Sequence, residues 1–161
     1  MSGLDTTAIT AIYDALVSHA QALGIFDQVN DAELTAPPGS GVVCAIMLGD
    51  LAPARAGSGL AATSGRLEFQ ARVYAPRLSQ TPGAVDRLIL GATCTLLAAY
   101  SGDFELDLAP DGLVREIDLL GAYGTPLSAT AQWLMAGGDS PTRVMTISLP
   151  LIINDMWGQT G

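Results

Sequence analysis

Residues 65–76 read Gly-Arg-Leu-Glu-Phe-Gln-Ala-Arg-Val-Tyr-Ala-Pro, and a short polar loop leads from them to a long apolar segment, Pro82–Tyr100. Polar and apolar side chains alternate in the first stretch, which is typical of a strand with one buried and one solvated face. The second begins with an N-cap hydroxyl, Thr81, followed by proline at the first helical position. Its apolar residues recur at helical spacing and cover a wide face: Val85, Leu88, Ile89, Leu90, Ala92, Cys94, Leu96, Leu97 and Ala99. We therefore expect a helix packed on an antiparallel sheet, with Phe69 and Leu88 in contact.

The remaining segments supply a second helix and further strands. Asp5 and the two threonines after it are expected to cap an amphipathic helix that Gly24 ends. Strand patterns follow at 25–30, 42–48, 103–108, 113–120, 127–136 and 143–153. Pro150 cannot donate to a β-ladder, so we expect an edge position or a bulge there. The order of helix, three strands, helix and four strands predicts one α+β domain over residues 1–161, with a mixed or antiparallel sheet covered by two helices.

The composition points to assembly with other subunits. Charged residues make up 14% of the 161 residues, against about 25% in an average soluble domain. So few charges predict apolar surface that a monomer leaves uncovered. All seven cations are arginines, and the formal net charge is −9. This charge disfavours sequence-independent binding to DNA and to an anionic membrane surface.

Neither a membrane segment nor a disulfide is expected. The longest apolar runs contain threonine and glycine and fall short of about 20 residues, so we expect no segment that spans a bilayer. The first residues, Met-Ser-Gly-Leu-Asp, lack the basic region of a secretory signal. Cys44 and Cys94 lie in apolar runs without C-x-x-C spacing, so both are expected to be buried free thiols, as a reducing cytosol would leave them.

Residues 49–65 differ in character from the rest of the chain. Small residues and glycines dominate, and no period is visible. We expect a long flexible loop there, poorly ordered in the free subunit and ordered on assembly. Its candidate assembly residues are Asp50, Leu51, Arg55 and Leu60. A Gly-Ser-Gly-Leu-Ala-Ala run in it is similar to a dinucleotide-binding motif, but the buried strand before it and the helix after it are missing.

Residues suited to catalysis are sparse. The single histidine, His19, lies at the margin of an apolar helix stripe, and no G-x-S-x-G motif accompanies it. The densest group of acids lacks the glycine and glutamate that a calcium loop needs at its sixth and twelfth positions: Asp103, Glu105, Asp107 and Asp111. We interpret these four acids as a solvated strand face. A glycosidase pair among the sixteen acids stays open, but no catalytic, cofactor-binding or metal-binding residue is assigned, and an enzyme is not expected.

Five segments resemble one family in their order and spacing. They are the helix, glycine and strand entry at 23–30, the Ala-Pro-Pro-Gly-Ser-Gly turn before 42–48, the strand at 69–74 before a long helix, and the segments 114–121 and 143–155. Together they resemble the tail terminator, or tail completion, proteins of long-tailed bacteriophages. The chain departs from that pattern at 31–34, where Asp-Ala-Glu-Leu stands in place of a common His-Glu-Pro-like stretch.

The resemblance implies a structural protein of the virion without an active site or cofactor. Such proteins form a hexameric ring that caps the tail tube, ends its polymerisation and docks the tail to the head connector. The implied partners are further copies of the chain, the tail tube protein and the head connector or stopper protein, and DNA passes through the lumen without specific binding. The implied location is the neck end of the virion tail, with the host cytoplasm during assembly.

The four clustered acids are candidates for the lumen of that ring, and an outer face agrees equally with their alternation. The alternative in the same particle is another head–tail connector or neck protein. The alternative from a different class is a small soluble enzyme or ligand-binding domain.

Overall fold

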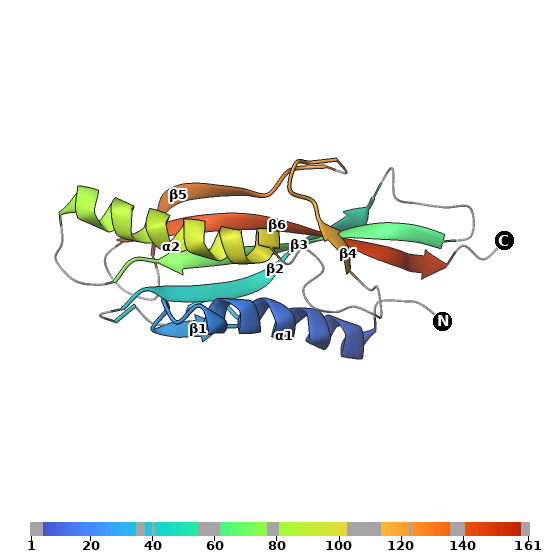
Figure 1. The fold of residues 1–161 in the computed structure, drawn as a ribbon, viewed down its shortest axis with the longest axis horizontal. Coiled ribbons are helices and arrows are strands. Elements are labelled where there is room, and N and C mark those ends of the chain that lie inside the picture. The colour runs from blue at the N-terminus through green and yellow to red at the C-terminus, as the bar shows by residue number, and fades with distance from the viewer. Residues whose placement is uncertain are drawn as a thin grey trace.

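The computed structural model of the chain describes residues 5–34, 38–39, 41–54, 62–76, 81–102, 114–122, 124–135 and 141–158. Within them lie two helices and six strands, in the order α1 (Thr6–Ala22), β1 (Gln28–Asn30), β2 (Val43–Pro53), β3 (Ala62–Tyr74), α2 (Pro82–Gly102), β4 (Val114–Ile117), β5 (Ser128–Met135) and β6 (Pro141–Gly158). The predicted α+β class is confirmed (Figure 1). The strand expected at 103–108 lies outside the described residues.

The strands form one mixed sheet in the order β1-β2-β3-β6-β4, and β5 also pairs with β6. β1 runs parallel to β2, and every other recorded pair is antiparallel. The long strand β6 has β3 along one side. On its other side, β5 pairs with residues 141–148 and β4 pairs with residues 151–153. The two edges of the sheet are therefore β1 at one side and β5 with β4 at the other.

Pro150 marks the place where β6 changes neighbours. The prediction of an edge position or a bulge is wrong, because β6 is paired on both sides and no register shift of the β3–β6 ladder falls at Pro150. Pro150 lies opposite Glu68 of β3, and its carbonyl accepts from the Asp118 amide at 2.9 Å on the other side. In an extended strand the nitrogen and carbonyl of one residue point the same way. The missing N–H therefore faces the gap between β5 and β4, where no ladder needs a donor.

Both helices pack on the same face of the sheet, where most of the core lies (Figure 1). Asp5 caps α1 by accepting from the Ala8 amide at 2.8 Å, and Gly24 follows its end with a φ of 66°, as predicted. The hydroxyl of Tyr100 on α2 donates to the Leu16 carbonyl of α1 at 2.9 Å. This bond joins the two helices inside the core.

Phe69 of β3 faces the core as predicted, but the expected packing against Leu88 is wrong. Phe69 is fully buried, whereas Leu88 is 39% exposed. The Phe69 ring meets the Tyr13 ring of α1 edge to face, with their centroids 4.9 Å apart. The reason is the rotation of α2 about its axis, which turns Ile89 and Leu96 to the sheet instead of Leu88.

The loop expected at 49–65 is shorter than predicted. β2 continues to Pro53 and β3 begins at Ala62, with Pro53 paired to Gly65. The Ala54 amide extends this pairing by donating to the Ser64 carbonyl at 2.8 Å. The glycine at position 49 allows β2 to lie close to β3, because a Cβ on Gly49 would lie 2.8 Å from the Glu68 carbonyl oxygen. Residues 55–61 lie outside the described part of the chain.

Candidate assembly surfaces

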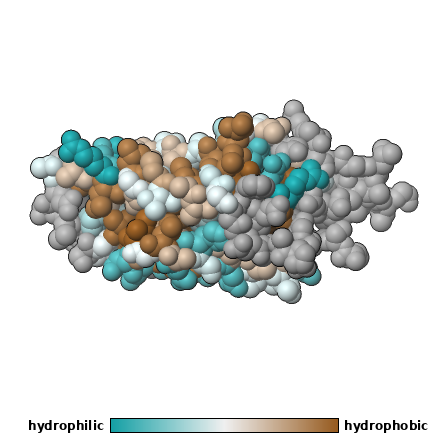
Figure 2. All heavy atoms as spheres, viewed as in Figure 1, coloured by the Kyte–Doolittle hydropathy of each residue, from teal (hydrophilic) through white to brown (hydrophobic). Residues whose placement is uncertain are grey.

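One side of α2 is packed and the other is bare. Ile89, Thr93, Leu96 and Tyr100 face the core. On the side away from the sheet, exposed residues follow Arg87 at three, four, seven and eleven positions, which is the spacing of one helix face. This outer stripe of α2 consists of Arg87, Leu90, Gly91, Cys94 and Ala98. Figure 2 shows hydrophobic residues gathered over this part of the molecule.

The sequence led us to expect no segment long and apolar enough to span a membrane, and α2 differs from that expectation. Residues Gly83–Gly102 form a helix long and apolar enough to cross a membrane by those two criteria, so the prediction that no segment qualifies is wrong. In a helix buried on all sides most of this stretch would be covered, but only 22% of it is buried within the subunit. Its inner side is fixed to the sheet and to α1. Its outer stripe therefore stays exposed in the single subunit.

The exposed apolar surface continues from α2 onto the edge strand β5. Trp133 is 56% exposed and Met135 is 59% exposed. The Arg143 guanidinium lies 5.2 Å from the centroid of the Trp133 ring, and its Nε donates to Asp86 Oδ1 at 2.9 Å. These contacts hold the start of α2 beside β6 and β5. We call the outer stripe of α2 together with Trp133 and Met135 the α2–β5 surface.

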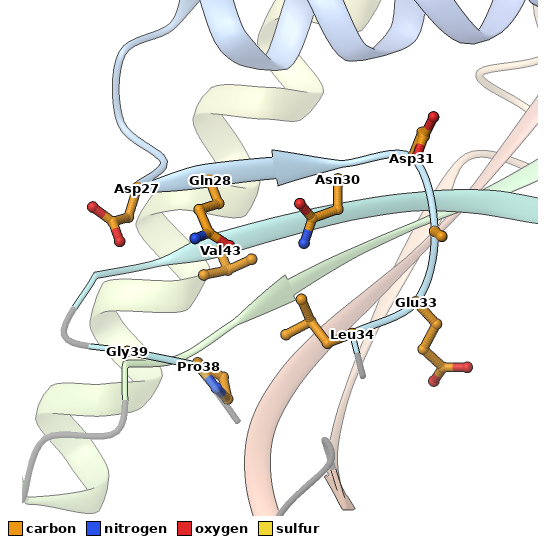
Figure 3. A pocket seen from close by; sticks show the side chains of 10 residues that line it. Asp27, Gln28, Asn30, Asp31, Glu33, Leu34, Pro38, Gly39 and Val43 are labelled. Carbon is orange, nitrogen blue, oxygen red and sulfur yellow. The ribbon is translucent and has the colours of Figure 1, made fainter. Parts of the chain in front are cut away.

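The opposite edge of the sheet carries a cavity and a group of acids. A cavity of about 490 Å³ lies between β1 and the segment that follows it. Its walls include Gln28, Asn30, Leu34 and Val43 (Figure 3). A second cavity, of about 310 Å³, lies on the α1 side of β1. Four exposed acids border the two cavities, and we call them the acidic edge: Asp14, Asp27, Asp31 and Glu33.

The acidic edge has no geometry for a metal ion. Asp27, Asp31 and Glu33 point in three different directions around the larger cavity (Figure 3). Glu33 also forms an ion pair with Arg72. Among the described residues, no group of three or more His, Cys, Asp or Glu side chains could hold a metal. Asp31 is the acid that borders both cavities.

The sheet face without helices carries a polar network on β3. The prediction of a solvated face is wrong here, because Arg66 is buried and Glu68, Gln70 and Arg72 are only partly exposed. Arg66 Nη1 donates to Glu68 Oε2 at 3.0 Å, with both side chains at most 13% exposed. Arg66 Nη2 also donates to the Thr125 carbonyl at 2.5 Å. Sequence reasoning missed these pairings, because Arg66 and Thr125 are 59 residues apart. The network holds the segment between β4 and β5 against the sheet.

Among its described residues, that segment presents one large apolar side chain to solvent. The carboxylate of Asp118, itself buried, accepts from the Ala122 amide at 2.7 Å. Gly121 follows with a φ of 79°, a conformation that glycine adopts without strain. Leu120, between them, is 93% exposed. A leucine held out by a fixed turn adds to the apolar surface that the subunit leaves bare.

Three buried polar atoms farther along β3 and β6 lack a hydrogen bond among the described residues: Arg72 Nε, Tyr74 OH and Thr146 Oγ1. Burial raises the pKa of Tyr74, and the nearby Arg72 lowers it by a smaller amount. Arg72 and Thr146 are direct neighbours across the β3–β6 ladder. This part of the face is polar and closely packed, and the larger cavity lies beside it, bordered by Glu33 and Leu34.

The structure describes two of the four residues expected to serve assembly. Asp50 and Leu51 lie on β2, both are exposed, and a register shift of the β2–β3 ladder falls between Leu48 and Leu51. Arg55 and Leu60 lie outside the described residues, as do the four acids considered for a lumen: Asp103, Glu105, Asp107 and Asp111. The described residues therefore bring Asp50 and Leu51 together, on a strand between the two edges of the sheet.

His19 and the two cysteines were singled out in the sequence, and the structure shows the contact of the histidine and the burial of each thiol. His19 Nδ1 lies 2.7 Å from the Ala15 carbonyl oxygen, one turn earlier in α1. Cys44 is buried, and burial raises the pKa of its thiol to about 12. Cys94 is exposed, so the prediction of two buried thiols is wrong for it. The apolar run around Cys94 belongs to a helix that buries one side only.

Comparisons with known proteins find likeness only among solved structures. No family model matches the chain, and no curated protein matches it. Among the matching solved structures is the sheath/tube terminator, in the extended state, of PVC, an extracellular contractile injection system. The identity is 11% and the TM-score is 0.36, over all of this chain and 60% of that chain. This chain thus spans about three fifths of that protein's length, and a likeness this low carries no argument about function.

Proposed function

We propose that this protein is a tail terminator: a ring-forming structural subunit that caps a phage tail tube, ends its polymerisation and docks the tail to the head connector. The proposal starts from the family resemblance of segments 23–30, 42–48, 69–74, 114–121 and 143–155. It assigns the chain no catalytic residue and no cofactor. Its partners are further copies of the chain, the tube protein and the connector, at the neck end of the virion.

The observation that carries the proposal is the bare α2–β5 surface. A helix of 21 residues with so much apolar surface outside the core is costly to leave in water. Subunit contacts in an assembly would remove that surface from water. The surface lies on one side of the subunit only, which fits a head-to-tail contact with a neighbour.

The charge of the chain fits a DNA passage that does not hold DNA. Of the five described arginines, Arg66, Arg72 and Arg143 form ion pairs with carboxylates of the same chain. A subunit with a net charge of −9 offers few free cations to displace counterions from phosphates. Duplex DNA could therefore move through the ring without being bound.

Capping of tail tubes tests the proposal. Purified subunit would be added to growing tubes of the tail tube protein from the same particle, and tube length would be measured by electron microscopy. A terminator stops growth at one end and forms a discrete closed oligomer in sedimentation. Because the subunits repel one another, assembly should improve as salt rises to about 0.15 M, where the screening length is about 8 Å. A chain that stays monomeric on tubes, or a tight complex with free duplex DNA at low salt, would contradict the proposal.

Binding to lipid vesicles tests whether the apolar helix α2 inserts into a membrane instead of contacting other subunits. If α2 inserts into membranes, the subunit will float with neutral vesicles and leave tube growth unchanged. The bond from Tyr100 to the Leu16 carbonyl opposes this, because insertion would have to pull α2 off the core. We expect no flotation.

A further inference from the structure

We propose that neighbouring subunits join by docking the α2–β5 surface of one copy onto the acidic edge of the next, with Arg87 paired to Asp31. This inference rests on the proposed function, since it names the contact that closes the ring. Its occupant is a second copy of this chain. Three observations support it. Arg87 makes no ion pair among the described residues, the acidic edge has carboxylates that also make none there, and the two surfaces lie on different sides of the subunit.

Arg87 is an exposed cation in an otherwise uncharged stripe. The other members of the outer stripe of α2 are a leucine, a glycine, a cysteine and an alanine. Within the described residues Arg87 makes no ion pair, whereas Arg66, Arg72 and Arg143 each do. Asp86 beside it is already bound to Arg143. A partner that covers the stripe must therefore supply a carboxylate for Arg87, because an unpaired charge buried in an interface is costly.

The acidic edge supplies carboxylates in excess. Asp14, Asp27 and Asp31 are exposed and form no ion pair among the described residues, and only Glu33 of the four acids is paired. Cavities of about 300–1,000 Å³ hold drug-sized molecules, so the one of about 490 Å³ accepts an arginine side chain. The planar guanidinium suits this role, because it can bind a carboxylate through two parallel hydrogen bonds.

The acidic edge also offers apolar contacts. Tyr13, Val17 and Val29 line the smaller cavity beside Asp31. They lie half-buried at the margin of the core. Leu90, one helical turn after Arg87, is 53% exposed and would find apolar cover there. The small side chains farther along the stripe allow the helix to approach closely.

The two surfaces lie toward opposite sides of the subunit, with the outer stripe of α2 over the sheet face and Trp133 and Met135 on the edge strand β5. The acidic edge surrounds β1, the first strand of the sheet order, and the α2–β5 surface includes β5, which lies beyond β6. In Figure 1, β1 and α1 lie along one side of the molecule, and α2 and β5 along the other. A ring needs two different complementary patches that face away from each other. The subunit has such a pair, one acidic and one whose cation, Arg87, makes no ion pair with any residue that the structure describes.

Charge reversal tests this contact. Arg87→Glu and Asp31→Arg each place like charges opposite one another, and each should raise the concentration needed for half-assembly by about tenfold or more. The double variant, with both changes in one chain, restores an opposite-charge pair and should recover assembly. Asp50→Arg is the matched control, because it changes the net charge as Asp31→Arg does on a strand away from both surfaces. Thermal melts check that each variant folds, and both target residues are exposed.

The outcomes separate the inference from the proposed function. If both single variants form rings as the natural chain does, or if the double variant fails to recover, this contact is wrong while the terminator function stands. If Asp50→Arg alone prevents assembly, the contact lies on β2 instead. If the natural chain never forms a ring, even on tail tubes, both the function and this contact are wrong.

Discussion

Arg143 Nε donates to Asp86 Oδ1 across 2.9 Å, and this bond joins β6 to the first turns of α2. The same guanidinium lies over the Trp133 ring of β5. One arginine therefore contacts all the elements that carry the α2–β5 surface. These two contacts tie that surface to β6.

Asp86→Asn should lower the free energy of unfolding by less than about 1 kcal/mol. The Asp86 side chain is 53% exposed, and solvent screens an ion pair of this kind. Urea melts measure the loss, with Asp50→Asn as a control at an exposed aspartate that forms no ion pair within the described part of the chain. A loss above about 2 kcal/mol would mean that the pair supports the core directly.

Phe69→Ala should cost about 3–5 kcal/mol, because its ring is fully buried and packs against Tyr13. That is a large share of the 5–15 kcal/mol that stabilises an average domain. Leu88→Ala serves as the control, since Leu88 is 39% exposed and should lose less than Phe69→Ala. Denaturant melts of both variants decide it. Equal losses would place α2 in another rotation on the sheet.

The two cysteines should differ in their reaction with a thiol reagent at pH 8. Cys44 has a pKa raised to about 12, so only roughly one thiol in ten thousand is ionised at that pH. It is also buried, whereas Cys94 is exposed. Mass spectrometry should find Cys94 modified and Cys44 intact until the protein unfolds. As pH rises toward 12, the thiolate fraction of Cys44 grows, but burial still limits access.

The same reagent reports on assembly. Cys94 belongs to the outer stripe of α2, so it should become protected when rings form. Cys44 in unfolded protein gives the full rate for comparison. Rapid modification of Cys94 in assembled rings would show that the stripe stays outside the contact.

Gly91→Ala should stabilise the free subunit by about 0.5–1 kcal/mol. Gly91 lies inside α2, where alanine is the better helix former, and among the described residues nothing beyond its chain neighbours and the surrounding helix backbone lies within 4 Å of the place where a Cβ would be added. The measurement is the melting temperature at a concentration too low for assembly. Gly121→Ala is the contrast, because its φ of 79° strains alanine and its Cβ would lie 2.7 Å from the Gly124 carbonyl oxygen. If Gly91→Ala destabilises the subunit, α2 is not a regular exposed helix at that point.

Local patterns predicted the elements well, because periodicity and caps act within a few residues. Asp5 caps the start of α1 and Gly24 follows its end, as expected, and the alternation around Phe69 gave the correct buried face. The predicted partner of Phe69 failed, since the rotation of a helix on a sheet depends on the packing of the whole face. The wide apolar face of α2 exceeded what one sheet face covers, so the sequence already held a sign of the outer stripe.

The rest of the candidate surface depends on contacts between distant residues. Glu33 meets Arg72 across 39 residues, and Asp86 meets Arg143 across 57. No spacing rule connects such pairs, and only the completed sheet brings them together. The glycines of 49–65 were misleading, because Gly49 permits close strand approach and does not loosen the chain.

The opposite placement of β1 and β5 in one twisted sheet bears on the number of subunits. Adjacent strands rotate by about 20–25° relative to each other, and β2, β3 and β6 separate these two edges. The accumulated twist sets the directions in which the edges face. In a ring closed through them, the rotation from one subunit to the next is therefore a property of the single chain. A substitution that flattened the sheet would leave each contact intact and change how many copies close the circle.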